Sequence, residues 1–405
     1  MLDVLESLDE EALVPTPRVP ARLAALAATS AVALGGLAAS GGTATAGPSA
    51  ARPAAVAEQH DHRGPLVFGH RGASGYRPEH TLASYELAIR LGADVIEPDL
   101  VTTSDGVLVA RHEPEISATT DVAGHPEFAS RRTTKSVDGT PTTGWFTEDF
   151  TLAELRTLRA KERIPQIRPR NTLYDGRYQV PTFQEVVDLA QRESRRYGRQ
   201  IGLAPETKHP TYFRAQGKPL EPALVRTLIR SGLNRPGSKV YVQSFEVSNL
   251  VALRQVLRVN LVQLTSATGA PYDFVATGDP RTYADLITPA GLQQVARYAD
   301  VLGPEKGQIV PRDATGALLT PTMLVRDAHQ ARLDVVPYTF RNENTFLPLD
   351  FRRGTDPTAY GDAFAEYELF FSLGVDGLFS DNPDTAREAR DDFVQAAAEG
   401  ERAAG

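Results

Sequence analysis

Two carboxylates lie inside one apolar run of this chain, and a histidine follows an earlier run. His70 comes directly after Leu66–Gly69, while Glu97 and Asp99 lie two residues apart within Val95–Val101. Residues two apart on a strand point to the same face, so both carboxylates should lie together. Their apolar neighbours indicate burial, and buried carboxylates are costly unless a cation or basic groups compensate them. The pattern therefore predicts a charged site on this strand.

A second histidine, His112, is expected to reach the same place through a hairpin. The run Val107–Arg111 begins only five residues after the run that carries the carboxylates. A parallel crossover needs about a dozen residues or more, whereas Asp105-Gly106 is a hairpin turn signal. The second run should therefore return antiparallel, which places His112 roughly opposite Pro98 and beside the carboxylate pair.

Polar residues recur at the ends of later apolar runs: Glu206 and Lys208, then Gln243 and Phe245, then Tyr338 and Asp381. Three carboxylates with neither cysteine nor an H-E-x-x-H motif favour a hard cation, Ca²⁺ or Mg²⁺, over zinc. Two histidines can act as general base and general acid on opposite oxygens of a phosphorus centre. Arg71 and Lys208 add positive charge for an anionic substrate. The set points to metal-assisted phosphodiester chemistry.

Short apolar runs alternate with helical patterns from Leu66 onward, which is typical of βα units. The candidate strands are Leu66–Gly69, Val95–Val101, Val107–Arg111, Ile201–Glu206, Val240–Ser244, Leu261–Thr265, Asp300–Gly303, Val335–Thr339 and Gly377–Ser380. The hairpin return removes one of these nine runs from the barrel and leaves eight parallel strands. Helices are predicted at Thr81–Leu91, Phe183–Gln191, Leu220–Ser231, Ser248–Leu257, Pro289–Tyr298 and Pro321–Ala331. We therefore expect an α/β fold, a (β/α)8 TIM barrel, which carries its functional groups at the C-terminal ends of its strands.

The barrel is expected to occupy residues 65–390, followed by a C-terminal tail at 391–405. An insertion at about 113–180 shows no clear βα unit and contains a short predicted helix, Leu152–Ala160, and the only tryptophan, Trp145. A long insertion after an active-site strand is usually a lid or specificity element.

Residues 1–46 have the parts of a secretory signal peptide. Arg18 and Arg22 precede the apolar run Leu23–Ala39, and an A-x-A site ends at Ala46, so we expect cleavage near Ala46 and a secreted protein. The run is rich in Ala and Gly and shorter than about 18 residues, which favours a cleaved signal over a permanent membrane span. Residues 47–64, rich in Ala, Pro and Gly, are expected to be a linker. The first eleven residues are acidic, which leaves an Ala-rich tail of a cytoplasmic protein as the alternative.

Composition excludes several classes of protein. The net charge of −8 argues against a general nucleic-acid binder, because phosphate contacts need concentrated Lys and Arg. The chain has no cysteine, so disulfides, thiolate metal sites and cysteine nucleophiles are excluded.

Three segments, Gly69–Thr81, Glu97–Leu100 and Arg111–Glu113, resemble the glycerophosphodiester phosphodiesterase family. The chain is most similar to the long periplasmic or secreted bacterial type, and the resemblance runs from about Leu66 to Asp384. It extends through Thr119–Val122, Pro181–Phe183, Pro205–Lys208, Val240–Phe245, Pro337–Thr339 and Gly377–Asp381.

The resemblance implies a (β/α)8 barrel with a small inserted subdomain that hydrolyses glycerophosphodiesters to sn-glycerol 3-phosphate and an alcohol. It implies His70 and His112 as the acid/base pair, with Glu97, Asp99 and Glu206 as ligands of a divalent cation, Ca²⁺ first and Mg²⁺ as the alternative. Arg71 and Lys208 map onto phosphate-binding positions. Gln243, Phe245 and Tyr338 are further candidate substrate contacts. Trp145 is expected either to contact the glycerol moiety or to be a core residue.

Two alternatives use the same scaffold. A phospholipase-type phosphodiesterase would need exposed apolar surface near the barrel mouth, and the insertion shows no basic amphipathic helix, so a soluble small-molecule substrate is preferred. A non-catalytic phosphate-ester binding protein would lack a histidine or a carboxylate of the set, whereas all are present. The sequence does not predict the headgroup or the oligomeric state.

Overall fold

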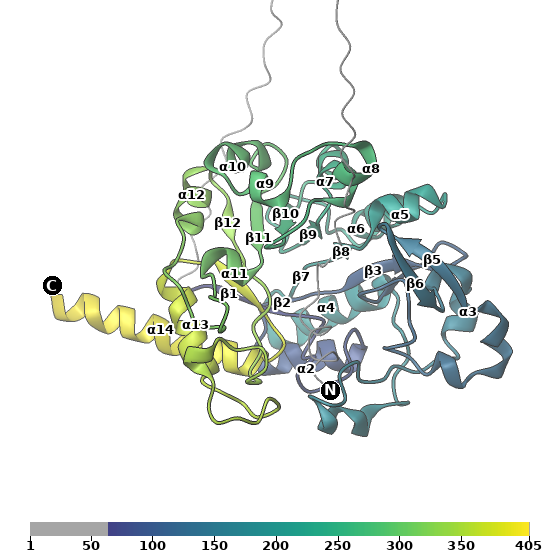
Figure 1. The fold of residues 1–405 in the computed structure, drawn as a ribbon, viewed down its shortest axis with the longest axis horizontal. Coiled ribbons are helices and arrows are strands. Elements are labelled where there is room, and N and C mark those ends of the chain that lie inside the picture. The colour runs from purple at the N-terminus through teal and green to yellow at the C-terminus, as the bar shows by residue number, and fades with distance from the viewer. Residues whose placement is uncertain (1–63, 405) are drawn as a thin grey trace, which may run out of the picture. The chain divides into compact units, whose positions relative to one another are not determined.

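The computed structural model describes residues 64–404, and its centre is a ring of parallel strands surrounded by helices (Figure 1). The predicted signal peptide lies outside the described residues, as does all of the predicted linker except Gly64. The strands are β1 (Leu66–Gly69), β2 (Val95–Ile96), β3 (Asp99–Thr102), β4 (Leu108–Ala110), β5 (Thr133–Val137), β6 (Thr140–Gly144), β7 (Gly202–Leu203), β8 (Glu206–Thr207), β9 (Tyr241–Ser244), β10 (Asn260–Thr265), β11 (Val301–Pro304), β12 (Asp334–Val335) and β13 (Gly377–Ser380).

Two of the barrel strands are interrupted, each at a proline. Pro98 separates β2 from β3 and Pro205 separates β7 from β8, because proline has no N–H to donate to a ladder. The segments before the prolines, β2 and β7, pair with each other and form the lower part of the two strands. The segments after the prolines, β3 and β8, pair with each other and form the upper part. The order of neighbouring strands is thus β13-β1-β2-β7 below the breaks and β12-β11-β10-β9-β8-β3-β4 above them.

Backbone hydrogen bonds join β13, at the end of the first order, to the segment that begins with β12, at the end of the second. The N–H of Asp376 donates to the carbonyl of Val335, that of Phe379 to Pro337, and that of Phe340 to Phe379. All neighbouring barrel strands pair in parallel. The predicted TIM-barrel fold with eight parallel strand positions is therefore confirmed.

The helices lie between and around these strands (Figure 1). Their bounds are α2 (Leu82–Leu91), α3 (Leu152–Leu155), α4 (Phe183–Tyr197), α5 (Pro210–Ala215), α6 (Glu221–Arg230), α7 (Val247–Arg254), α8 (Tyr272–Thr277), α9 (Tyr283–Leu286), α10 (Pro289–Val295), α11 (Lys306–Ile309), α12 (Leu324–Gln330), α13 (Ala363–Ser372) and α14 (Pro383–Ala404). Thr182 caps α4 with a reciprocal capping box to Glu185, which fixes its start as predicted. Helix α14 continues through residues 391–404, so most of the expected C-terminal tail is helical.

The antiparallel return that places His112 is confirmed. Strand β4 pairs antiparallel with β3, with Leu100 opposite Ala110, and the same register sets residue 112 opposite residue 98. The insertion contains a second hairpin, β5–β6, that we did not predict. It is closed by Asp138 and Gly139, both with positive φ, as a two-residue hairpin turn requires.

The core has a part inside the barrel and a part between barrel and helices. The interior cluster consists of Phe68, Val95, Ala204, Val262, Leu264, Val301, Val336, Tyr338 and Phe379. Outside, α2 packs against α4 and α14, and its buried face includes Tyr85 and Ile89. Among the helices of residues 64–404, none is long and apolar enough to cross a membrane.

A tight turn after β1 orients the residues that follow it. Gly72 has a φ of +89°, and a Cβ there would lie 2.6 Å from the backbone carbonyl carbon of Ser84. Gly106 in the β3–β4 turn also has positive φ, +78°, but a Cβ there would meet nothing within 4 Å. A side chain at Gly106 would therefore meet backbone strain alone, whereas a side chain at Gly72 would meet both backbone strain and a steric clash.

We expect Gly106→Ala to lower the free energy of unfolding by about 1 kcal/mol, the cost of left-handed backbone for alanine. Gly72→Ala should cost roughly 2 kcal/mol more, because α2 must also move away from the turn. Urea denaturation of the two variants measures both values. Equal losses would show that the turn after β1 has room to relax.

Candidate active site

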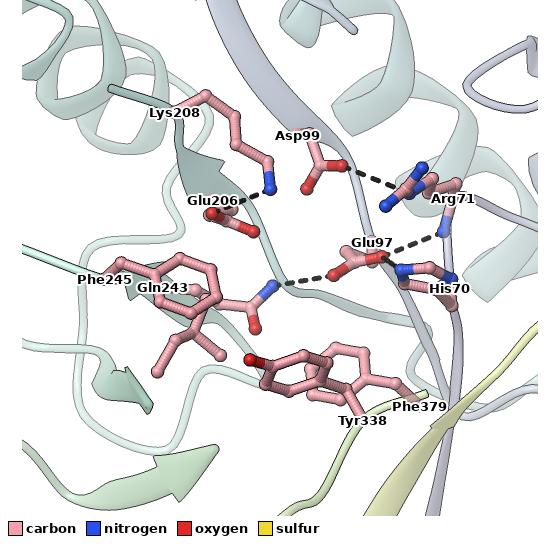
Figure 2. Close-up of a pocket in the computed structure, with 11 residues that line it drawn as sticks. His70, Arg71, Glu97, Asp99, Glu206, Lys208, Gln243, Phe245, Tyr338 and Phe379 are labelled. Atoms are coloured by element: carbon pink, nitrogen blue, oxygen red, sulfur yellow. Dashed lines mark hydrogen bonds and ion pairs between the residues drawn. The ribbon is translucent and has the colours of Figure 1, made fainter. Parts of the chain in front are cut away.

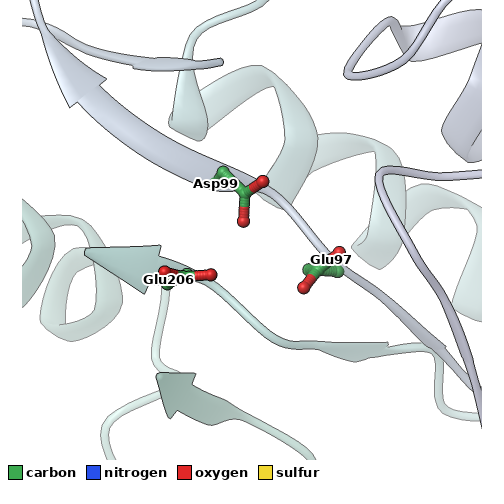
Figure 3. A group of neighbouring side chains, drawn as sticks. All are labelled: Glu97, Asp99 and Glu206. Atoms are coloured by element: carbon green, nitrogen blue, oxygen red, sulfur yellow. The ribbon is translucent and has the colours of Figure 1, made fainter. Parts of the chain in front are cut away.

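Three polar side chains lie in one row across neighbouring strands. Asp99 on β3 is in register with Glu206 on β8, and Glu206 is in register with Gln243 on β9. Glu97 precedes Asp99 by two residues, so it projects into the same space from just below the row. Figure 3 shows the three carboxylates converging from the two strands.

These carboxylates are crowded and buried. Each of Glu97, Asp99 and Glu206 offers an oxygen, and these oxygens lie within 4.8 Å of one another. All three residues are at most 4 % exposed. Burial, reinforced by the other two carboxylates, raises the pKa of Glu97 well above its usual range. Burial also raises the pKa of Glu206 to about 7, although Lys208 opposes the shift. The three carboxylates therefore resist being ionised together.

Asp99 is the carboxylate held ionised. Burial opposes its charge, but Lys208 and then His80 outweigh it, so the pKa of Asp99 lies well below its usual range. The Oδ2 atom of Asp99 lies 2.8 Å from Nε2 of His80, whose Nδ1 in turn lies 2.7 Å from the hydroxyl of Tyr85. Burial lowers the pKa of His80 to about 4, so His80 is neutral near pH 7. Asp99 Oδ1 has no hydrogen-bond partner among residues 64–404.

That donor set fits a hard divalent cation. Ca²⁺ and Mg²⁺ are bound in proteins by oxygen ligands, with carboxylates foremost. The three carboxylates can supply such ligands, and the buried Oδ1 of Asp99 is available for one of these bonds. A cation bound among them would offset the repulsion between the three ionised carboxylates.

The carboxylates form one wall of a small pocket at the barrel mouth (Figure 2). It is lined by His70, Arg71, Glu97, Asp99, Glu206, Lys208, Gln243, Phe245, Leu264, Tyr338 and Phe379. The structure thus brings nine of the eleven predicted site residues into one pocket.

The basic and amide groups of the pocket are tied to the carboxylates. The backbone N–H of Arg71 donates to Glu97 Oε2 at 2.9 Å, and the amide of Gln243 donates to Glu97 Oε1 at 3.2 Å. Lys208 Nζ lies 3.0 Å from Glu206 Oε1. Positive charge therefore faces the pocket beside the acidic group, where an anionic substrate would need it.

His70 is held by a buried carboxylate. Its Nδ1 lies 2.5 Å from Oδ1 of Asp381, the residue that follows β13, and its Nε2 lies 3.9 Å from Glu97. Asp381 Oδ2 accepts hydrogen bonds from Arg168 at 2.7 Å and Arg341 at 3.0 Å. Burial opposes the charge of Asp381, but these two arginines outweigh it and keep the pKa of Asp381 well below its usual range. Asp381 thus fixes the Nδ1 edge of His70 and leaves Nε2 directed toward the carboxylates.

His112 lies close to a more exposed carboxylate. Its Nδ1 lies 2.8 Å from Oε1 of Glu113, whose side chain is 48 % exposed. His112 does not line the pocket itself, yet its charge contributes to the pKa values of both Asp99 and Glu206. The β3–β4 hairpin therefore places the His112 ring next to the three carboxylates, at the end of β4 that lies away from the Asp105-Gly106 turn.

Trp145 lies elsewhere. Its indole N–H donates to the carbonyl of Phe128 at 2.7 Å, and its ring belongs to the apolar cluster of the insertion and outer barrel. It does not line the pocket. The placement matches the core alternative that the sequence left open.

Four residues that support the site were not assigned individual roles from the sequence: Asp381, Glu113, His80 and Arg168. Asp381 was recognised as a strand-end residue, and its place after β13 could have identified it. Glu113 adjoins a predicted catalytic histidine but was given no function. Local sequence patterns do not indicate the pairing of His80 or Arg168 with its carboxylate, since the partners are 19 and 213 residues away.

The chain matches the Glycerophosphoryl diester phosphodiesterase family over residues 70–385. It is 38 % identical to a glycerophosphodiester phosphodiesterase of Arabidopsis thaliana, covering 78 % of this chain and 83 % of the relative. It is 30 % identical to the glycerophosphodiester phosphodiesterase of Haemophilus influenzae, covering 80 % and 89 %.

Solved structures support the fold. A phosphodiesterase of Oleispira antarctica, determined in complex with the product sn-glycerol-3-phosphate, aligns with a TM-score of 0.51 at 21 % identity over 81 % of this chain and 97 % of that one. A structure from Silicibacter pomeroyi gives a TM-score of 0.57 at 21 % identity over 82 % and 94 %. From the family match and the two relatives, the chain belongs to the glycerophosphoryl diester phosphodiesterase family and is a phosphoric diester hydrolase.

Proposed function

We propose that this protein hydrolyses glycerophosphodiesters to sn-glycerol 3-phosphate and an alcohol. The observation that carries the proposal is the pocket in which a histidine–carboxylate pair and two basic side chains adjoin three buried carboxylates. The names of the Arabidopsis and Haemophilus relatives, which match most of the chain, supply the substrate class. A release assay for glycerol 3-phosphate from glycerophosphocholine tests this reaction, and release of phosphocholine would instead identify a phospholipase C-type cleavage.

The proposed metal ligands are Glu97, Asp99 and Glu206. Ca²⁺ is the first candidate and Mg²⁺ the second, since both cations take oxygen ligands and the site offers three carboxylates. These three residues would hold such a cation, which would supply positive charge that stabilises the charge developing on the phosphate. Lys208 and Arg71 line the same pocket, and we assign them to phosphate binding.

His70 and His112 are proposed as the acid/base pair. One imidazole accepts the proton of the attacking hydroxyl, and the other donates a proton to the departing alkoxide, so no charged alkoxide has to leave. In the form often drawn for this family, the attacking group is the glycerol hydroxyl, and water then opens the cyclic phosphate with the two roles exchanged. The contacts of both Nδ1 atoms with carboxylates support Nε2 as the nitrogen that transfers the proton.

The pocket walls suggest how the rest of the substrate is held. Phe245 and Tyr338 stand edge to face, with ring centroids 6.0 Å apart, and form an apolar wall opposite the carboxylates. Gln243, anchored through its amide to Glu97, keeps its Oε1 without a hydrogen-bond partner among residues 64–404. We propose that this oxygen and the aromatic wall bind the glycerol moiety.

For the metal, we expect EDTA to abolish turnover and Ca²⁺ to restore it. Glu97→Gln, Asp99→Asn and Glu206→Gln should each lower activity at least about 100-fold at a fixed Ca²⁺ concentration, since each removes a charged ligand. Glu193→Gln is the matched control, because Glu193 is equally buried but lies on α4 outside the barrel. Full activity in chelator would contradict the metal assignment.

For the histidines, His70→Ala and His112→Ala should each lower kcat by a factor of roughly 10² to 10⁴, the usual contribution of general acid–base catalysis. Circular dichroism should show that both variants remain folded. A folded variant with the wild-type rate would refute the acid/base role of that residue.

We also propose that the enzyme is secreted, with cleavage near Ala46, on the strength of the basic, apolar and A-x-A segments of residues 18–46. The expected result is a protein in the culture medium whose N-terminus, determined by Edman sequencing, lies close to residue 47. A protein retained in the cytoplasm with its N-terminal Met1 segment intact would contradict this proposal.

A further inference from the structure

Glu113 links the proposed catalytic His112 to a third histidine. One carboxylate oxygen of Glu113 lies 2.8 Å from His112 Nδ1, and the other lies 3.1 Å from Nε2 of His209. His209 directly follows Lys208 and precedes α5, so it reaches Glu113 from a different strand end of the barrel. The two histidines thus hold the same carboxylate from opposite sides.

His209 is itself held by the insertion. Its Nδ1 lies 2.6 Å from Oδ2 of Asp138, the first turn residue of the β5–β6 hairpin. Figure 1 shows this hairpin beside α5. The chain of contacts therefore runs from the hairpin of the insertion through His209 and Glu113 to His112.

Charge keeps this chain together. Burial opposes a proton on His209, but the hydrogen bonds to Asp138 and Glu113 outweigh it and raise the pKa of His209 to about 10. The groups packed around the half-exposed Glu113 partly desolvate its carboxylate and oppose its charge, but His112 followed by His209 outweighs this and holds the pKa of Glu113 well below its usual range. Near neutral pH, a cationic His209 therefore lies between two carboxylates.

The comparison with His70 shows why Glu113 needs such support. Asp381, the partner of His70, is 2 % exposed and is fixed by Arg168 and Arg341. The side chain of Glu113 is 48 % exposed. A half-exposed glutamate gives up rotamer freedom when it is fixed in one orientation. Without His209, water would compete for the carboxylate, and His112 would lose a defined partner.

We propose that Glu113 is the positioning residue of His112, and that His209, held by Asp138 of the insertion hairpin, positions Glu113. This inference rests on the proposed acid/base role of His112. It makes the insertion a part of the catalytic apparatus, since the docking of its hairpin sets the orientation of a ring that transfers a proton.

Steady-state kinetics with Glu113→Gln and His209→Asn test the proposal. Asparagine tolerates the left-handed backbone of residue 209, whose φ is 48°, but is too short to reach Glu113. We expect kcat to fall about 10- to 100-fold in Glu113→Gln and by a smaller factor in His209→Asn, with KM changed less than about twofold. Because His209 acts through Glu113, the double variant should be no slower than Glu113→Gln alone.

His329→Asn is the matched control, since His329 lies 2.8 Å from Asp376, which precedes β13 at the opposite end of the barrel. Its kcat should stay at the wild-type value. The proposal would be overturned if the fall in kcat of the double variant equalled the product of the two single-variant falls. A wild-type kcat in Glu113→Gln would also overturn it.

The ring nitrogens of His112 give a readout independent of turnover. We expect ¹⁵N NMR, at a pH where this ring is neutral and with its signals assigned by their loss in His112→Ala, to show the proton on Nδ1 in the wild type. The proton should be shared between Nδ1 and Nε2 in both positioning variants. An unchanged tautomer in both variants would overturn the inference. An active His112→Ala would instead refute the acid/base role itself, so the two failures are distinguishable.

Discussion

Mutual repulsion among buried carboxylates is the constraint around which this active site is organised. Glu97, Asp99 and Glu206 bring their oxygens within 4.8 Å at the mouth of the barrel, where water can screen little of their charge. The fold tolerates the repulsion between these carboxylates because backbone hydrogen bonds between parallel strands, and not the side chains, hold the residues in place. Lys208 and Arg71 compensate part of it. What remains is a site with affinity for a cation and, beside it, for a phosphate.

The proline interruptions and the hairpin decide which groups meet there. The strands break at Pro98 and Pro205 at neighbouring positions, so β2 pairs with β7 before the breaks and β3 pairs with β8 after them. The antiparallel return of β4 then brings His112 in from outside the barrel ring. His70 presents its Nδ1 to Asp381, and His112 presents its Nδ1 to Glu113. The two carboxylates differ in how firmly they are held.

Local sequence signals predicted the barrel and most of the pocket because both depend on period-two alternation and on strand ends. The signal Asp105-Gly106 gave the β3–β4 hairpin, and the equivalent Asp138-Gly139 would have given β5–β6 had it been applied to the insertion. The pairings of Arg168 with Asp381 and of His209 with Asp138 could not be predicted. They join segments far apart in the chain, and their formation depends on how the insertion packs.

The central claim, that the three carboxylates form a cation site, is tested most directly by a crystal structure of the Mn²⁺-soaked protein with anomalous data. The account predicts one strong anomalous peak bonded to oxygens of Glu97, Asp99 and Glu206, replaceable by Ca²⁺ at oxygen distances of about 2.3–2.6 Å. Absence of a peak there at saturating metal, or a peak held by other residues, would contradict it.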